Sequence, residues 1–164
     1  VIYLDENRVR KMALQGEYLT EWEVYPEIVE TDLVINCPIA KHHGLTQATL
    51  CMKNYMGVVG GRRNAWHQAL PACLTDITRF MKPQLCLLDA VRILTANGPQ
   101  SSQIADVARK DTIAVSTDIV ALEAFGVELL GNRPEAQQIA AKAGAAGLGN
   151  PDYKALNPKE IAVS

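Results

Sequence analysis

Short apolar runs typical of β-strands alternate along this chain with segments whose apolar residues recur at helical spacing. Residues 85–88 and 112–116 are two such runs, and residues 71–81 and 117–130 are the neighbouring helical segments. Chains with this alternation fold as α/β domains, in which helices cover the faces of a sheet. A length of 164 residues suits one domain. We therefore predict an α/β fold, with a mixed or parallel sheet flanked by helices, as a single domain over residues 1–164.

Prolines, glycines and capping residues predict the remaining elements. In chain order they are a strand-like run at 1–4, a hairpin or two short strands within 9–25, a helical turn at 26–30, a buried strand at 32–38 ended by Pro38, a central strand within 84–91, a helix capped by Ser116 or Thr117 and stopping at Gly131, a helix from Pro134 to near Gly144, and a closing strand at 161–163. The stretch from 39 to 65 has no regular pattern and contains most of the candidate functional residues.

Composition argues against several classes of protein. No apolar run approaches the ~18–20 residues that span a bilayer, so we expect no membrane-spanning segment. The formal net charge is −2, and the only dense basic spots, Arg8 to Lys11 and Arg62-Arg63, are typical of solvated faces, so we expect no nucleic-acid partner. The four cysteines form no CxxC pair, which argues against zinc-ribbon and ferredoxin sites. We predict buried free thiols at Cys37, Cys51, Cys73 and Cys86.

The start of the chain leaves its cellular location open. The first residues lack the charged start and apolar core of a secretory signal, so the cytoplasm is the default location. Because the chain begins with Val1 rather than methionine, we also treat it as a candidate fragment of a longer protein, for which export remains an alternative.

Polar residues gather at the predicted ends of strands. Residues 36–43, 89–99 and 116–118 all follow or end an apolar run. In open α/β sheets, ligands bind outside the carboxyl ends of the strands. The sequence therefore predicts a ligand site where these three segments converge.

Lys41, His42 and His43 form the first polar segment. Adjacent histidines on extended backbone point to opposite sides, so only one of the pair can face a common site. An imidazole with a pKa near 6.5 suits a general base or a metal ligand. The alternative is a polar surface loop.

Lys53 and Asn54 stand within an otherwise apolar segment. A partly desolvated lysine can act as a base, a Schiff-base nucleophile or an anchor for an anion, whereas an exposed lysine needs no special role. The glycines that follow, beginning with Gly57, precede Arg62 and Arg63, and such a segment forms either an anion cradle or a flexible lid.

Asp89 ends a predicted central strand, and Gly98 lies in an Asn-Gly-Pro turn beyond it. A carboxylate there can bind a metal, orient a histidine or cap the next turn, and Asn-Gly-Pro is also ordinary turn chemistry. Asp118 fits a helix cap better than a catalytic residue.

Read in order, these segments resemble the family known as domain of unknown function 362 (DUF362). The matching segments are 32–43 for its strand followed by Lys-Thr-His, 49–57 for its Thr-Leu-x-x-Lys-Asn-x-x-Gly, His67 for its isolated histidine, 82–90 for its Lys-Pro, strand and Asp-Ala, then Gly98-Pro99 and 116–131. The resemblance covers residues 28–150. It departs at His42, where the family usually has threonine, and at Glu123, where it usually has aspartate.

The resemblance implies little about activity, because the family lacks a settled one. Some members carry an added ferredoxin-like iron–sulfur domain or a twin-arginine export signal, and neither occurs in these residues. The order His43, Lys53, His67 also loosely resembles the arrangement in nickel-pincer lactate racemases, where lysine tethers the cofactor and histidine reaches the nickel. Which of His42 and His43 faces the site stays open.

Two functions are compatible with these residues. The first is an enzyme or redox-associated protein that binds a small anionic ligand or a transition metal in a cleft at the strand ends. Its candidate residues are Lys53, His43 and Asp89 for catalysis, Lys41, Asn54, Gly57 and Gly98 for ligand or cofactor binding, and His43 and His67 for the metal. The second is a non-catalytic accessory module of an iron–sulfur or electron-transfer system, with a redox protein as its partner.

Overall fold

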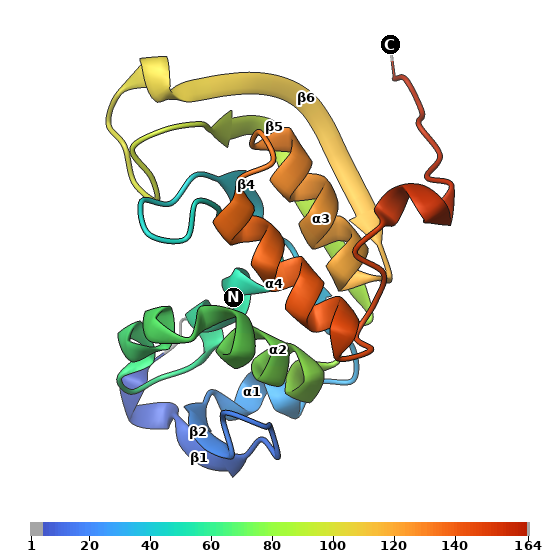
Figure 1. Cartoon of the computed structure of the whole chain (residues 1–164). Coiled ribbons are helices and arrows are strands. Elements are labelled where there is room, and N and C mark those ends of the chain that lie inside the picture. Colours follow the sequence, from blue (N-terminus) through green and yellow to red (C-terminus); the bar gives the residue numbers. More distant parts are fainter. Residues whose placement is uncertain (1–4, 164) are drawn as a thin grey trace.

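A mixed four-stranded sheet organises the fold (Figure 1). The computed structural model describes residues 5–163, without the side chain of Glu6. Its strands are β3 (Ile35–Asn36), β4 (Ile39–Lys41), β5 (Leu85–Leu94) and β6 (Val107–Ser116). β3 and β4 follow one another along one edge of β5, both parallel to it, and β6 pairs antiparallel with its other edge. The α/β class with a mixed sheet is confirmed.

Pro38 divides what the sequence predicts as one buried strand over 32–38. Its missing N–H ends β3, and the chain resumes pairing as β4. The Pro38 carbonyl still accepts a hydrogen bond from Asp89 N at 2.9 Å. The prediction of burial was wrong for Ile35, which is 49% exposed because it lies on the uncovered face of the sheet.

Three helices form a layer over one face of the sheet and extend beyond it (Figure 1). They are α2 (Leu70–Met81), α3 (Ile119–Leu129) and α4 (Pro134–Ala145), and α4 packs between α2 and α3. The prolines at the starts of α2 and α4 occupy first-turn positions where no N–H is needed. The predicted helices at 71–81 and from Pro134 to near Gly144 are confirmed.

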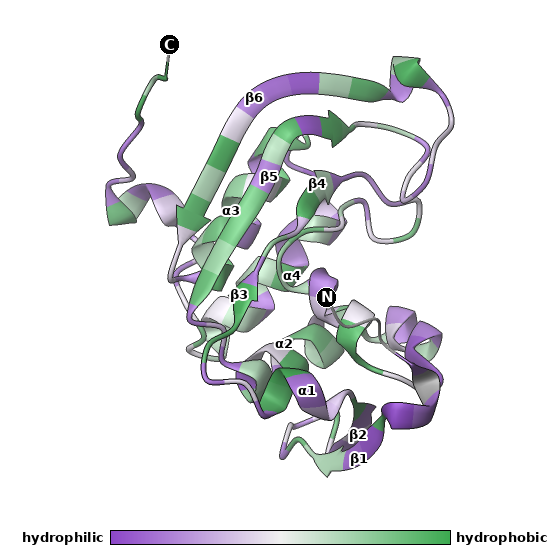
Figure 2. Cartoon of the chain, turned by 180° about the vertical axis from the view of Figure 1, so that it is seen from behind, coloured by the Kyte–Doolittle hydropathy of each residue, from purple (hydrophilic) through white to green (hydrophobic). Residues whose placement is uncertain are grey.

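The side chains of β5 alternate between the two faces of the sheet. Cys86, Leu88 and Ala90 are buried beneath the helix layer. The opposite face, called the open face below, has no helix over it in the part of the chain that the structure describes (Figure 2). It consists of Ile35, Ile39, Leu85, Leu87, Asp89, Val91, Ile113 and Val115. Ile113 is 59% exposed and Val115 is 56% exposed, so the open face is apolar and accessible.

A small antiparallel hairpin precedes the sheet, made of β1 (Arg10–Ala13) and β2 (Glu21–Val24) and followed by α1 (Pro26–Val29). This confirms the predicted hairpin and helical turn. The 3₁₀ helices are η1 (Glu6–Arg8), η2 (Lys53–Val58), η3 (Arg63–Gln68), η4 (Ile104–Asp106) and η5 (Tyr153–Leu156).

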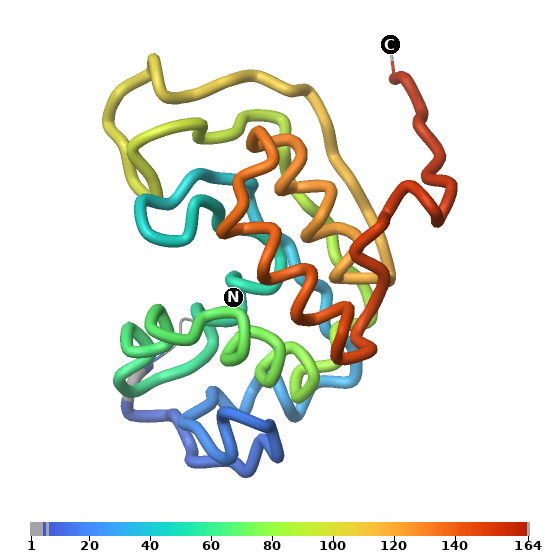
Figure 3. Tube along the Cα trace, in the orientation of Figure 1, coloured from blue at the N-terminus to red at the C-terminus, as the bar shows by residue number. Residues whose placement is uncertain are grey.

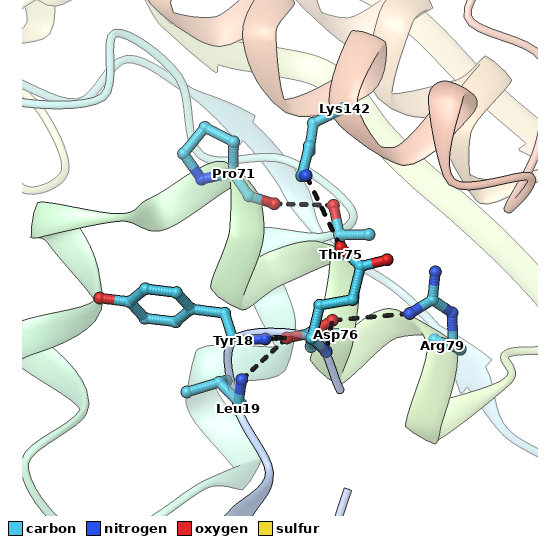
Figure 4. Close-up of polar contacts among 8 residues, drawn as sticks. Tyr18, Leu19, Pro71, Thr75, Asp76, Arg79 and Lys142 are labelled. Atoms are coloured by element: carbon cyan, nitrogen blue, oxygen red, sulfur yellow. Dashed lines mark hydrogen bonds and ion pairs between the residues drawn. The ribbon is translucent and has the colours of Figure 1, made fainter. Parts of the chain in front are cut away.

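The turn of this hairpin is attached to α2 by Asp76, whose carboxylate is 3% exposed (Figure 4). It accepts hydrogen bonds from the backbone N–H groups of Glu17, Tyr18 and Leu19 at 3.2, 2.7 and 2.8 Å. Arg79 lies one helical turn away with its guanidinium 3.6 Å from the carboxylate. We call these contacts the Asp76 anchor. The buried N–H of Leu19 and the part-buried N–H groups of Glu17 and Tyr18 thereby have an acceptor.

Two further features support the Asp76 anchor. A methyl group on Gly16 would overlap the Asp76 side chain, so the turn needs glycine at this position. Lys142 of α4 lies 3.9 Å from the Glu17 carboxylate and joins the third helix to the same turn (Figure 4). The hairpin is thus tied to two helices of the core.

Three local predictions need correction. Asp118, not Ser116 or Thr117, caps α3, because its carboxylate accepts from the N–H groups of Val120 and Ala121 at 2.9 Å. Cys37 is exposed in the loop between β3 and β4, whereas the other three cysteines are buried free thiols. Residues 161–163 are exposed and form no strand. The predicted strand at 1–4 lies outside the described residues.

None of the helices among residues 5–163 combines the length and hydropathy needed to cross a bilayer.

Candidate functional site

The carboxyl ends of the parallel strands β4 and β5 lie side by side, as the prediction of the site requires (Figure 3). His42 N donates to Leu94 O at 2.7 Å, and Gly44 N donates to Gly98 O at 3.2 Å. A Cβ on Gly98 would overlap the His42 carbonyl, so this glycine permits the close approach of the two loops. Ser116 is at the other end of the sheet, opposite Cys86, because β6 runs antiparallel. The segment 116–118 therefore does not join the site.

Beside these strand ends, four basic side chains come together. We call Lys41, His43, Lys53 and His67 the basic cluster. Lys53 Nζ donates to Thr46 Oγ1 at 3.0 Å, and Thr46 N donates to His43 Nδ1 at 3.4 Å. The imidazoles of His43 and His67 stack with their ring centroids 5.5 Å apart. The structure thus brings together side chains that are 26 positions apart or less in sequence but belong to β4, η2, η3 and a loop.

Burial and the charges of neighbouring groups lower the pKa values of Lys53 and His43. Burial, and then the charge of Lys41, lower the pKa of Lys53 to about 8. Burial, followed by the charge of Lys53, lowers the pKa of His43 to about 4, so His43 is neutral at pH 7. Among the described residues, neither lysine has a carboxylate within ion-pair distance. The carboxylate of Glu123 acts on Lys53 without forming an ion pair and raises its pKa, against the effects of burial and of Lys41.

The hydrogen bonds of the two stacked imidazoles fix where each ring has its proton. His43 Nδ1 accepts from the N–H groups of Leu45 and Thr46, so the proton of the neutral ring is on Nε2. His67 Nδ1 lies 3.0 Å from the carbonyl oxygen of Asn64, which can only accept, so this ring has its proton on Nδ1. Nε2 of His67 is buried and has no partner within residues 5–163.

These proton positions bear on the predicted metal site. His43 and His67 are neighbours, but neutral His43 offers no free lone pair, because Nδ1 is occupied and Nε2 is protonated. In the described part of the chain, no group of three or more histidine, cysteine or acidic side chains is arranged to hold a metal ion.

Glu123, in α3, positions the segment that carries Lys53. Its carboxylate accepts from the backbone N–H of Met52 at 2.8 Å and is 1% exposed. Burial raises the pKa of Glu123 to about 7, while hydrogen bonds from Met52 and Cys51 and the charge of Lys53 oppose this shift. Sequence reasoning missed this role, although it had marked Glu123 as a departure from the DUF362 pattern.

Asn54 stabilises the same segment from the side of the sheet. Its Nδ2 donates to Asn36 Oδ1 at 2.7 Å, and Asn36 Nδ2 donates to Cys51 O at 2.8 Å. This chain of amides links η2 to β3. Asn54 is therefore next to Lys53, with its amide nitrogen engaged in the protein.

Asp89 and Gly57 do not belong to the basic cluster. Asp89 is in the middle of β5, not at its end as predicted, because the strand continues to Leu94. Its side chain is on the open face, and Oδ1 accepts from Val91 N at 2.9 Å. Gly57 is exposed in η2, and a Cβ there would meet no atom within 4 Å. Asp89 thus lies in mid-strand on the open face, and none of its hydrogen bonds joins it to the basic cluster.

Two surface cavities lie away from the basic cluster. One of about 360 Å³ lies among α3, α4 and η5, and its rim includes Glu128 and Lys154. A second, of about 260 Å³, lies beside α1. Neither contains a residue of the basic cluster, so neither is the predicted cleft at the strand ends.

Comparison with known families identifies the chain. The model of a family described as domain of unknown function (DUF362) matches residues 1–128. The chain belongs to the DUF362 family. The match includes every residue of the basic cluster, and it confirms the resemblance seen in the sequence motifs.

One relative is the thylakoid-associated protein sll1697 of the cyanobacterium Synechocystis, which is 26% identical to this chain over 133 residues. The alignment covers 76% of this chain and 40% of the relative, so the chain spans less than half of that protein's length. No solved structure matches the chain.

Proposed function

We propose that this DUF362 chain binds a small oxyanion at the basic cluster, as the ligand-binding part of an enzyme or redox-associated protein. One observation carries the proposal: two lysines and two histidines lie together, with Lys53 only 6% exposed, and no carboxylate in the described residues forms an ion pair with either lysine. Keeping a buried ammonium costs free energy unless a partner meets it. A bound anion is the partner that this arrangement lacks.

The residues of the basic cluster have separate roles in this proposal. Lys53, held by Thr46, supplies the charge that binds the anion, and Lys41 adds a second positive charge at the strand end. His43 donates through Nε2–H, because its Nδ1 already accepts backbone hydrogen bonds. Lys53 and His43 keep their proposed places as catalytic candidates, since both would touch the ligand. Asp89 is left out because it is on the other face of the sheet.

The test is binding of inorganic phosphate and of succinate, measured by isothermal titration calorimetry at pH 7 and low ionic strength. The wild-type chain should bind at least one of them saturably with one-to-one stoichiometry. Lys53→Met should weaken that binding about tenfold or more, which corresponds to one charge-assisted hydrogen bond. Its melting temperature should not fall, because methionine fills the same buried space without the cost of a buried charge.

A matched control is Lys110→Met, which removes an exposed lysine from β6. It changes the net charge equally, so its affinity for the anion should stay at the wild-type value. Equal losses in the two variants would mean that only the overall charge matters. No binding of either anion by the wild-type chain would contradict the proposal.

A second candidate is the non-catalytic accessory module, and the open face favours it. Most side chains on this face of the sheet are aliphatic, yet no helix covers it within residues 5–163. A partner protein would cover its aliphatic side chains. Ile113→Lys should then remove a stoichiometric partner that wild-type and Lys110→Met chains retain on purification from the native source. Retention of that partner by Ile113→Lys would contradict docking through the open face.

A further inference from the structure

The edge strand β6 has one half that is protected against further pairing and one half that is not. It pairs with β5 along one edge, and no strand lies beside its other edge in the part of the chain that the structure describes. Free sheet edges accept further strands, and proteins usually block them with charges, prolines or bulges. The first half of β6 is blocked in this way, because the ladder has a bulge at Asp111, whose φ is 47°, and because Asp111 forms an ion pair with Arg109 at 2.6 Å. Residues 112–116 contain no charge, proline or bulge.

A segment that follows η5 has the pattern of a strand but no partner. Ile161 and Val163 are two positions apart, so in an extended chain their side chains project to the same side. They are β-branched, and they are 80% and 91% exposed. Pro158 has no N–H to donate, which limits the pairing segment to residues 159–163. This segment is as long as the unprotected half of β6.

Within one copy, the structure keeps these two segments apart. η5 is attached to α3 through the ion pair of Lys154 with Glu128 at 2.8 Å. From η5 the chain leaves the body of the molecule on the side of β6, and residues 157–163 are all exposed (Figures 1 and 2). No strand pairing or isolated bridge joins them to β6. A free strand edge and an unpaired segment with a strand pattern are therefore accessible in the same chain.

We propose that residues 159–163 of one copy pair with the free edge of β6, at residues 112–116, in a second copy. The register that places apolar beside apolar residues puts the aliphatic side chains of the added strand on the open face, next to Ile113 and Val115. Two copies exchange these segments reciprocally, and this two-fold arrangement fills both edges and leaves none for a third copy. The inference goes beyond the proposed anion binding and does not depend on it.

The segment of a second copy fits this edge better than two other occupants do. The chain's own segment is one of them, and the structure of a single copy holds it away from β6. The β6 edge of another copy is the other, and direct pairing of two such edges leaves Ile161 and Val163 in water. Exchange of the segments removes both aliphatic side chains from water and pairs the free edge at the same time.

The test is the state of association of the wild-type chain over a range of protein concentrations, measured by sedimentation velocity. The wild-type chain should form a dimer. Ile161→Lys should weaken the dimer about tenfold or more, because the ammonium cannot replace a buried aliphatic side chain. Ile104→Lys is the matched control, since Ile104 is 90% exposed in η4 and the substitution makes the same change in charge and apolar surface. Its dimer should keep the wild-type dissociation constant.

Hydrogen exchange of the wild-type chain locates the contact without any variant. The backbone amides of 112–116 and 159–163 should exchange more slowly in concentrated than in dilute solution, because dilution dissociates the dimer. Protection of both segments in the monomer would mean that each chain pairs with its own segment, and would overturn the proposal. A dimer that Ile161→Lys leaves intact would overturn it in favour of direct pairing between β6 edges. A wild-type chain that is monomeric at every concentration, with neither segment protected, would also overturn it.

Discussion

The Asp76 anchor and the basic cluster each contain a buried charged residue, Asp76 and Lys53, but the two differ in how fully their polar groups are paired. In the anchor, a carboxylate meets three backbone N–H groups and has a guanidinium beside it. In the cluster, two ammonium groups lie near each other with no ion pair among the described residues, and one imidazole nitrogen has no partner. A satisfied network stabilises the fold, whereas an unsatisfied one is where a ligand gains the most from binding. We propose that this difference separates a structural site from a ligand-binding one.

The largest expected effect is on the Asp76 anchor. Asp76→Ala should lower the free energy of unfolding by about 3–5 kcal/mol, because one buried and two part-buried N–H groups lose their acceptor and Arg79 loses its partner. Urea denaturation followed by circular dichroism measures this change. Asp32→Ala, at an exposed position, is the matched control and should change stability by less than about 0.5 kcal/mol. If Asp76→Ala instead weakened anion binding and left the free energy of unfolding unchanged, the assignment of the two sites would be reversed.

The next effect concerns Glu123, a buried carboxylate that belongs with the basic cluster. Its pKa is raised from 4.5 to about 7, so the folded chain favours the protonated form. Its contribution to stability is therefore fully present below pH 4.5 and is lost as the pH rises to 7, by up to about 3 kcal/mol. Gln can still accept the Met52 N–H but cannot ionise.

The free energy of unfolding of Glu123→Gln should therefore lack the loss between pH 4.5 and 7 that Glu123 causes in the wild-type chain. At pH 7 the variant should be more stable than the wild-type chain. Unfolding by urea at several pH values, compared with the wild-type chain, measures it. If Glu123→Gln were as unstable at pH 7 as Asp76→Ala, the charge of Glu123 would be needed as the partner of Lys53. The basic cluster and the Asp76 anchor would then both be structural sites.

The smallest effect is on ligand affinity rather than on folding. The pKa of Lys53 is lowered to about 8, with Lys41 and Glu123 acting on it in opposite directions. Only the protonated ammonium attracts an anion, so the affinity for sulfate, which does not titrate here, should fall as the pH rises through 8. Titrations between pH 6.5 and 9.5 measure it, and Lys53→Met should give a nearly flat profile. A wild-type profile that is also flat would remove Lys53 from the site.

Local patterns predicted the helices well. The apolar spacing over 71–81 and Pro134 predicted α2 and α4, because these signals act within a few residues of the chain. The family motif likewise marked Lys53 and His67 without knowledge of their neighbours. What such signals could not predict is how far a strand extends, since the ends of β5 depend on pairing with β4 and β6. For that reason Asp89 was predicted at a strand end but lies in the middle of β5.

The sequence by itself determined the fold class, the family and most of the basic residues of the site, because periodicity, prolines and short motifs are local properties. Only the tertiary structure decided which of His42 and His43 joins Lys53, that Asp89 faces away, and that Glu123 holds the Lys53 segment. These depend on contacts between elements up to 71 positions apart. Burial and the position of a proton on an imidazole follow from such contacts, and no local pattern encodes them.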